Sequence, residues 1–237
     1  MLQEAQKALK FKITPVVIPY GLELKPFSYV SKASVKISLG IPENRKIIAI
    51  SAHVLNDPRK GIKYAIAALQ SVRDLSPFVI AIGMCNDELR QALEGLEFKE
   101  MGYISDPNFL AQVYSATDVV LFCTLADNLP LTVLEAMAAS TPVVGFSTGG
   151  VPEMIQTGRN GILVEPTNQQ ALNQALRQAL LSADLEVMGQ TARRDVENNF
   201  SKAAFVKRHL QLYQNFEHSL SKSPLQSVVA TEVAINK

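Results

Sequence analysis

The sequence has few cysteines, and it lacks the patterns of a secreted or membrane-spanning chain. Its 237 residues include two cysteines, Cys85 and Cys123, and both lie in apolar, strand-like runs. Isolated thiols in such runs are typical of buried, reduced cysteines, and their spacing does not resemble a zinc site. The N-terminus has no charged and then apolar leader, and no run approaches the about 18 uninterrupted apolar residues of a membrane helix. We therefore expect a soluble, cytoplasmic protein, with peripheral attachment to a membrane left open.

An excess of charge of one sign is also lacking. The formal net charge is +1, which argues against nucleic-acid binding driven by bulk charge and leaves only a local basic patch open. Hydrophobic residues make up 47% of the chain and charged residues 19%, as in ordinary globular proteins. A chain of this length buries about 70% of its unfolded surface, so that neither a metal nor a disulfide is needed to hold the core together.

Strand-like and helix-like segments alternate along the chain. Short apolar runs predict strands at 47–51, 78–83, 98–104, 118–122, 142–146 and 161–164. Apolar residues at helical spacing predict helices at 61–75, 87–96, 109–116, 131–139, 151–156, 168–182, 184–198 and 201–219. Such alternation is typical of parallel βαβ units, so we predict an α/β fold: a Rossmann-like parallel sheet with helices on both faces.

The two ends of the chain differ from this pattern. Residues 1–30 hold an extended piece without a complete βα unit, and we interpret them as a linker. The Rossmann-like domain is expected at 31–200, followed by a terminal helix at 201–220. Residues 221–237 contain the sequence Lys-Ser-Pro at 222–224 and are weakly periodic, which favours a disordered tail.

The loop after the strand at 118–122 carries the most informative polar residues. In open parallel sheets, ligands bind beyond the carboxyl ends of the strands. Here Asp127 precedes a helix, Pro130 suits the first helical position, and Glu135 lies about a turn and a half inside. The free N–H groups at 131–133 would then face an anion, and the two carboxylates would accept hydrogen bonds from sugar hydroxyls. The residues alone leave another interpretation open, in which Asp127 is a helix cap and Glu135 a solvated helix residue.

A longer motif contains this loop. The run DNLPLTVLEAMAASTPVVGFSTGG at 127–150 resembles the signature of retaining glycosyltransferases of family 4, also called group 1. The resemblance continues at 18–23, 58–61, 102–104, 151–155 and 158–164, and it spans roughly residues 16–220. It implies the GT-B fold of two facing Rossmann domains, of which this chain corresponds to the C-terminal, donor-binding one. It also implies a nucleotide-diphosphate sugar as donor, transfer with retention, and no metal or other cofactor.

The resemblance also implies roles for individual residues. Glu135 matches the acid that holds the ribose hydroxyls, and Asp127 stands near the transferred sugar, where the family usually has a glutamate. Lys60 matches the lysine that neutralises the diphosphate, so Asp127 and Lys60 are the expected catalytic residues. Further donor contacts are implied for Arg59, Tyr103, Ile104, Leu131, Thr132, Gly149 and Gly150. Without the resemblance, Lys60 would be taken for an exposed charge in a turn.

The sequence departs from the family pattern at two positions, and it does not contain the acceptor-binding domain of the family. Asp127 is one methylene shorter than the usual glutamate, and no arginine precedes Lys60 at the family's position. His53 lies in that stretch instead. We expect it to make an ordinary hydrogen bond, and the alternative is that it replaces the arginine. The acceptor-binding domain, which precedes this domain in the family, is not in the chain, and the terminal helix at 201–220 normally crosses back to it. We therefore expect a transferase part that needs a separate N-terminal domain or partner subunit. The alternatives are a non-catalytic nucleotide-sugar binding module and a scaffold that has lost the chemistry.

Overall fold

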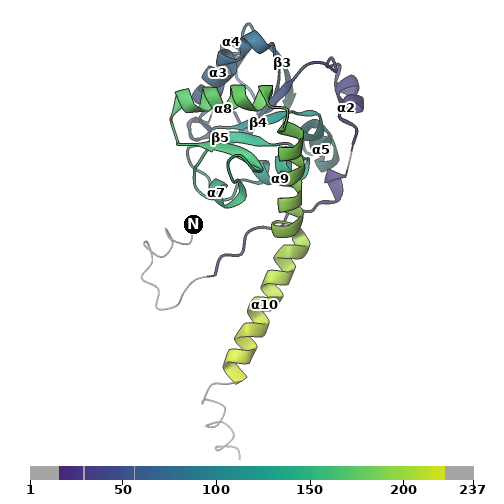
Figure 1. Ribbon diagram of the computed structural model, residues 1–237, viewed down its shortest axis with the longest axis vertical. Helices are drawn as coiled ribbons and strands as arrows, with labels where there is room; N and C mark the ends of the chain where they lie inside the picture. The colour runs from purple at the N-terminus through teal and green to yellow at the C-terminus, as the bar shows by residue number, and fades with distance from the viewer. Residues whose placement is uncertain (1–15, 29, 56, 222–237) are drawn as a thin grey trace, which may run out of the picture.

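The protein is built on a six-stranded, fully parallel sheet with the strand order β3-β2-β1-β4-β5-β6 (Figure 1). The computed structural model describes residues 16–28, 30–55 and 57–221. The strands are β1 (Ile47–Val54), β2 (Phe78–Met84), β3 (Glu97–Gly102), β4 (Val119–Phe122), β5 (Val143–Phe146) and β6 (Gly161–Val164). Every residue of β4 and β5 is buried, as the continuous apolar runs predicted for strands covered on both faces.

Helices cover both faces of the sheet and form two cores (Figure 1). One face carries α2 (Lys32–Leu39), α5 (Pro107–Ala116), α6 (Leu131–Ala138), α7 (Val151–Met154) and α9 (Leu185–Asn199). The other carries α3 (Ile62–Ser71), α4 (Asp87–Ala92) and α8 (Gln169–Leu181). Tyr114 and Met137 fill the first core, and Leu69 and Leu172 fill the second. The predicted α/β class with helices on both faces is therefore confirmed.

Several element boundaries differ from those predicted. The helix α2 was not predicted at all, although Gly40 closes it in the left-handed conformation with φ +73°. The helix expected at 61–75 ends at Ser71 and continues as the 3-10 turn η3 (Arg73–Leu75). The strand β1 extends past Ser51 to Val54, which pairs with Met84 after a shift in register. Beside this shift the chain of Gly83 comes so close that a Cβ there would lie 1.7 Å from the Ala52 carbonyl oxygen.

The N-terminal segment returns to the end of the domain. The Leu22 N–H donates to the Phe200 carbonyl at 2.7 Å, and the Lys202 N–H donates to the Leu22 carbonyl at 2.9 Å. The 3-10 turn η1 (Lys25–Phe27) follows, and Phe27 is buried in the first core. The predicted linker at 1–30 is thus partly packed on the domain, while its residues 1–15 and 29 lie outside the described residues. Of the tail predicted at 221–237, Ser221 belongs to the last helix, and residues 222–237 lie outside the described residues.

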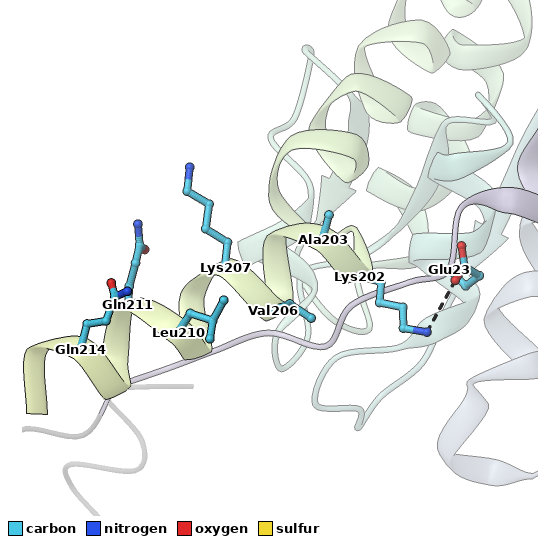
Figure 2. A pocket seen from close by; sticks show the side chains of 8 residues that line it. All are labelled: Glu23, Lys202, Ala203, Val206, Lys207, Leu210, Gln211 and Gln214. Carbon is cyan, nitrogen blue, oxygen red and sulfur yellow. Dashed lines mark ion pairs between the residues drawn. The ribbon is translucent and has the colours of Figure 1, made fainter. Parts of the chain in front are cut away.

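The last helix, α10 (Lys202–Ser221), projects away from the sheet (Figure 1). A groove of about 760 Å³ runs along it, lined by Glu23 and one side of α10 (Figure 2). Phe205 is half-buried and packs at a tilt against the ring of His209, with ring centroids 4.2 Å apart, whereas Phe216 is 62% exposed. In the described part of the chain, no helix is long and apolar enough to cross a bilayer.

Candidate functional site

The strand order places the candidate site between β1 and β4. These strands are neighbours in the sheet, but the chain proceeds from β1 toward β2 on one side and from β4 toward β5 on the other. At such a reversal the loops leave the sheet in opposite directions and a crevice opens between them. The crevice here lies between the loop that ends at Gly61 and the loop that leads from Cys123 to Pro130.

Backbone contacts hold these two loops together. The first loop ends in the 3-10 turn η2 (Pro58–Lys60), which begins with Asp57 accepting a hydrogen bond from the Arg59 N–H at 2.9 Å. The Leu125 N–H donates to the Arg59 carbonyl at 2.7 Å. Gly61 has φ +64°, and a Cβ there would lie 2.0 Å from the Cys123 carbonyl oxygen. Only glycine permits this approach, so the backbone of Lys60 is held beside the end of β4.

Lys60 and Asp127 meet across the crevice. Lys60 Nζ lies 3.0 Å from Asp127 Oδ2, although the two residues are 67 positions apart in the sequence. The side chains are 31% and 23% exposed, so the ion pair is only partly screened by water. The structure therefore brings together the two residues that we expected to be catalytic.

The contacts of Asp127 exclude its interpretation as a helix cap. Pro130 occupies the N-cap position of α6 with ψ 120°, and no side chain caps the helix. The expectation that Pro130 is the first helical residue is therefore wrong by one position. Val133 is not free either, because its N–H donates to the Pro130 carbonyl at 3.1 Å. The N–H groups of Leu131 and Thr132 have no partner among the described residues, and these two remain available to an anion.

Glu135 lies one turn inside α6 and is not a solvated helix residue. Its side chain is half-buried, and this burial raises the pKa of the carboxyl above its ordinary value. Within the described residues, no group donates a hydrogen bond to it. The buried Tyr114 lies close enough to feel the charge of Glu135. Burial first, and this charge second, raise the pKa of the Tyr114 phenol. Tyr114 donates instead to Ser51 Oγ at 3.0 Å, so Glu135 retains its acceptor capacity.

A third loop, between β5 and α7, closes on Asp127. Gly149 has φ +56°, and a Cβ there would lie 1.7 Å from the Asp127 carbonyl oxygen. Gly150 is buried and forms the N-cap of α7. The Oγ1 atom of Thr148, next to these glycines, is buried without a hydrogen-bond partner in the part of the chain that the structure describes. Gly149 thus permits a close contact between the two loops.

The remaining predicted donor residues lie around the rim. The guanidinium of Arg59 is 76% exposed and pairs with Asp57 at 2.7 Å rather than joining Lys60. Tyr103 is 64% exposed and meets the ring of His53 edge-on, with centroids 5.2 Å apart, while Ile104 packs against the first core. His53 makes this ring contact in place of the expected hydrogen bond; no described residue bonds to its ring nitrogens.

Sequence reasoning missed Tyr114 and the site role of Ser51. Ser51 gave a weak signal, because it is a polar residue that follows four apolar residues of a strand. A small cavity of about 20 Å³ lies between Ser51, Lys60 and Thr124. No cluster of three metal-ligating side chains occurs among the described residues. Of the two acidic residues of the site, Asp127 is paired with Lys60, and Glu135 has no ion-pair partner among the described residues.

Comparison with known proteins identifies the family. A family model described as "Glycosyl transferases group 1" matches residues 44–182. The chain belongs to this family. An uncharacterized glycosyltransferase of Methanocaldococcus jannaschii is 27% identical over 196 residues, which cover 79% of this chain and 49% of that protein. The chain spans about half the length of the relatives that it matches.

Solved structures show the same fold. Sucrose-phosphate synthase from Thermosynechococcus elongatus aligns with a TM-score of 0.78 and 24% identity, over 92% of this chain and 56% of that one. The HepE protein of Anabaena, solved with UDP and glucose, aligns with a TM-score of 0.70 and 21% identity, over 82% and 55%. The group 1 chain described here therefore has the fold of the C-terminal domain of GT-B glycosyltransferases.

Proposed function

We propose that this group 1 chain binds a nucleotide-diphosphate sugar and is the donor-binding part of a retaining glycosyltransferase. The observation that carries the proposal is the convergence of Lys60, Asp127 and Glu135 with two free backbone N–H groups at the β1–β4 crevice. A cation, two carboxylates and a helix N-terminus match the chemistry of a donor that carries a diphosphate between two polyhydroxylated rings.

Each group has a distinct task in this proposal. Lys60 and the free N–H groups of Leu131 and Thr132 stabilise the negative charge that develops on the leaving nucleoside diphosphate. Glu135 accepts hydrogen bonds from the ribose hydroxyls, which are the strong, charge-assisted kind. Asp127 faces the transferred sugar. Tyr103 and Ile104 contact the base at the rim.

The chemistry of the donor supports this division of tasks. The HepE protein, which has the same fold, was solved with UDP and glucose. In the proposal the diphosphate leaves from the anomeric carbon, and the acceptor attacks on the face that the leaving group occupied. The acceptor is held by a second domain or subunit, and no metal or further cofactor takes part. The alternative, a nucleotide-sugar binding module, uses the same residues without turnover.

Binding of a nucleoside diphosphate tests the proposal. We expect isothermal titration calorimetry to show weak binding of UDP, because one wall of the cleft acts alone. The substitution Glu135→Gln keeps the shape but lowers the acceptor strength, so it should weaken binding by about 1.5–3 kcal/mol, as for hydrogen bonds to charged groups. Glu94→Gln is the matched control, because Glu94 is exposed in the turn before β3, at the opposite edge of the sheet. Equal affinities of Glu135→Gln and the unmodified chain would remove Glu135 from the ribose role. Absence of binding at millimolar UDP and UDP-glucose would remove the donor site as a whole.

A further inference from the structure

The two side chains proposed for the diphosphate and the sugar are bonded to each other in this structure. Lys60 Nζ lies 3.0 Å from Asp127 Oδ2, and both side chains are more than two-thirds buried. The positive charge of Lys60 is therefore already partly balanced by this carboxylate. An anion that binds Lys60 competes with Asp127 for that charge.

We propose that Asp127 makes the site prefer the nucleotide sugar over the free nucleoside diphosphate, because its carboxylate competes with the terminal phosphate for Lys60. The inference rests on the proposed function for the identity of the ligand. It assigns Asp127 a specificity role in which the carboxylate repels a free diphosphate and is satisfied by the hydroxyls of the transferred sugar.

The geometry limits how the pair opens. The backbone of Asp127 is held by Gly149, and the backbone of Lys60 is held by the Arg59 carbonyl and by Gly61. The loops therefore keep the two Cα atoms in place, and only the side chains move. Lysine has a flexible four-carbon stem, whereas aspartate has a single methylene group. Lys60 consequently swings toward the phosphate, while the carboxylate stays where it is.

A free nucleoside diphosphate and a nucleotide sugar interact differently with the Asp127 carboxylate once Lys60 has moved away. A free diphosphate takes Lys60 and places its own negative charge beside an unpaired Asp127, and like charges in a partly buried site repel. A nucleotide sugar also takes Lys60, but its sugar hydroxyls donate hydrogen bonds to the carboxylate and replace the lost partner. Arg59 does not relieve the repulsion, because its guanidinium is already paired with Asp57. After transfer, recapture of Lys60 by Asp127 favours departure of the nucleotide.

Calorimetry with three probes tests the inference: UDP, UDP-glucose and inorganic pyrophosphate. Asp127→Asn removes the competing charge at nearly constant shape. It should tighten the binding of UDP and pyrophosphate by roughly threefold to tenfold, as expected for loss of one ion pair of intermediate exposure. The affinity ratio of UDP-glucose to UDP should fall in this variant. Asp127→Glu keeps the charge and should keep the preference for UDP-glucose, and the remote Glu94→Gln should behave like the unmodified chain.

The outcomes separate this inference from the proposed function. Unchanged or weaker binding of both UDP and pyrophosphate to Asp127→Asn would overturn it. Tighter pyrophosphate binding by Asp127→Asn, with no nucleotide binding by any variant, would support the competition and contradict the proposed function. Thermal melting checks that the variants are folded, and Asp127→Ser, which also removes the carboxylate, serves if Asp127→Asn does not fold.

Discussion

Glu135 combines a position suited to binding with a cost to stability. Its carboxylate is half-buried without a donor among the described residues, and burial raises its pKa. The Glu135 carboxyl therefore holds its proton more tightly in the folded state than in the unfolded state, where it is exposed. Such a group reduces stability once it is ionised, and a bound ligand that donates hydrogen bonds removes this cost.

This balance predicts a stabilising substitution. Because the pKa of Glu135 is raised in the folded state, its unfavourable contribution is absent below the unfolded pKa of about 4.3 and grows as the pH rises through the folded pKa. Glu135→Gln has no such contribution. Its melting temperature should therefore exceed that of the unmodified chain at pH 7, and the difference should disappear near pH 4. A variant that melts lower at pH 7 would show that the carboxylate has a stabilising partner.

At the same scale, the site residues were predicted from a motif but their contacts were not. Asp127, Glu135 and Lys60 were identified from their resemblance to the family signature. The ion pair of Lys60 with Asp127 joins residues 67 positions apart, and it depends on the close approaches of Gly61 and Gly149. No local pattern reports such an approach. The pairing of Arg59 with Asp57, in contrast, is local, because it joins residues only two positions apart.

Among the elements, β4 links the site to the opposite edge of the sheet. Asp118 directly precedes β4 and is buried, and its carboxylate accepts from the Ile47 N–H at 2.8 Å and from Lys32 Nζ at 2.9 Å. Lys46 and the buried Lys36 lie 3.5 and 3.9 Å away. Burial acts to raise the pKa of Asp118, but the lysines and the Ile47 N–H together lower it. This carboxylate therefore connects α2 to the starts of β1 and β4.

We predict that Asp118→Asn destabilises the fold by about 3 kcal/mol, the lower end of the range for breaking a buried pair, because Lys32 and Lys46 are half-exposed. Urea unfolding measures the change. Since the Asp118 pKa is lowered, the difference should shrink as the pH falls and the native carboxyl is protonated. Asp74→Asn is the matched control, because it breaks an exposed pair with Arg177 and should change little. The UDP affinity of folded Asp118→Asn should be unchanged. An unaltered unfolding midpoint would contradict the assigned role.

The same network explains why α2 was missed. The six strands and the helices that alternate with them were predictable because their apolar residues follow one period over each segment. In α2 only Val35 and Leu39 face the core at helical spacing, Ile37 is 65% exposed, and Lys36 is buried. Because lysines are mostly exposed, a pattern of apolar residues places Lys36 on the solvent-facing side of a helix. Its burial depends on Asp118 and on the carbonyl groups of Glu43 and Arg45, which are tertiary partners.

For the whole molecule, the residues that we propose to bind the sugar donor lie at one edge of one sheet, where the strands end. The chain spans about half the length of the curated relatives that it matches, and the rim residues Tyr103 and Leu131 are 64% and 51% exposed. An exposed rim leaves a bound donor in contact with water. Sugar transfer requires donor, acceptor and leaving group to be held together, and such positioning supplies roughly 7–11 kcal/mol of barrier reduction.

We therefore predict that the isolated chain binds the donor but does not transfer its sugar. The assay is release of UDP from UDP-glucose, with Glu135→Gln as the blank, and we expect equal rates from the two proteins because neither holds an acceptor or excludes water. Addition of the N-terminal domain of a group 1 relative as a separate chain should raise the rate for the unmodified chain only, since the second wall then covers the crevice between β1 and β4. Release that is faster than the blank, from the purified chain without any partner, would show that one sheet edge is sufficient for catalysis.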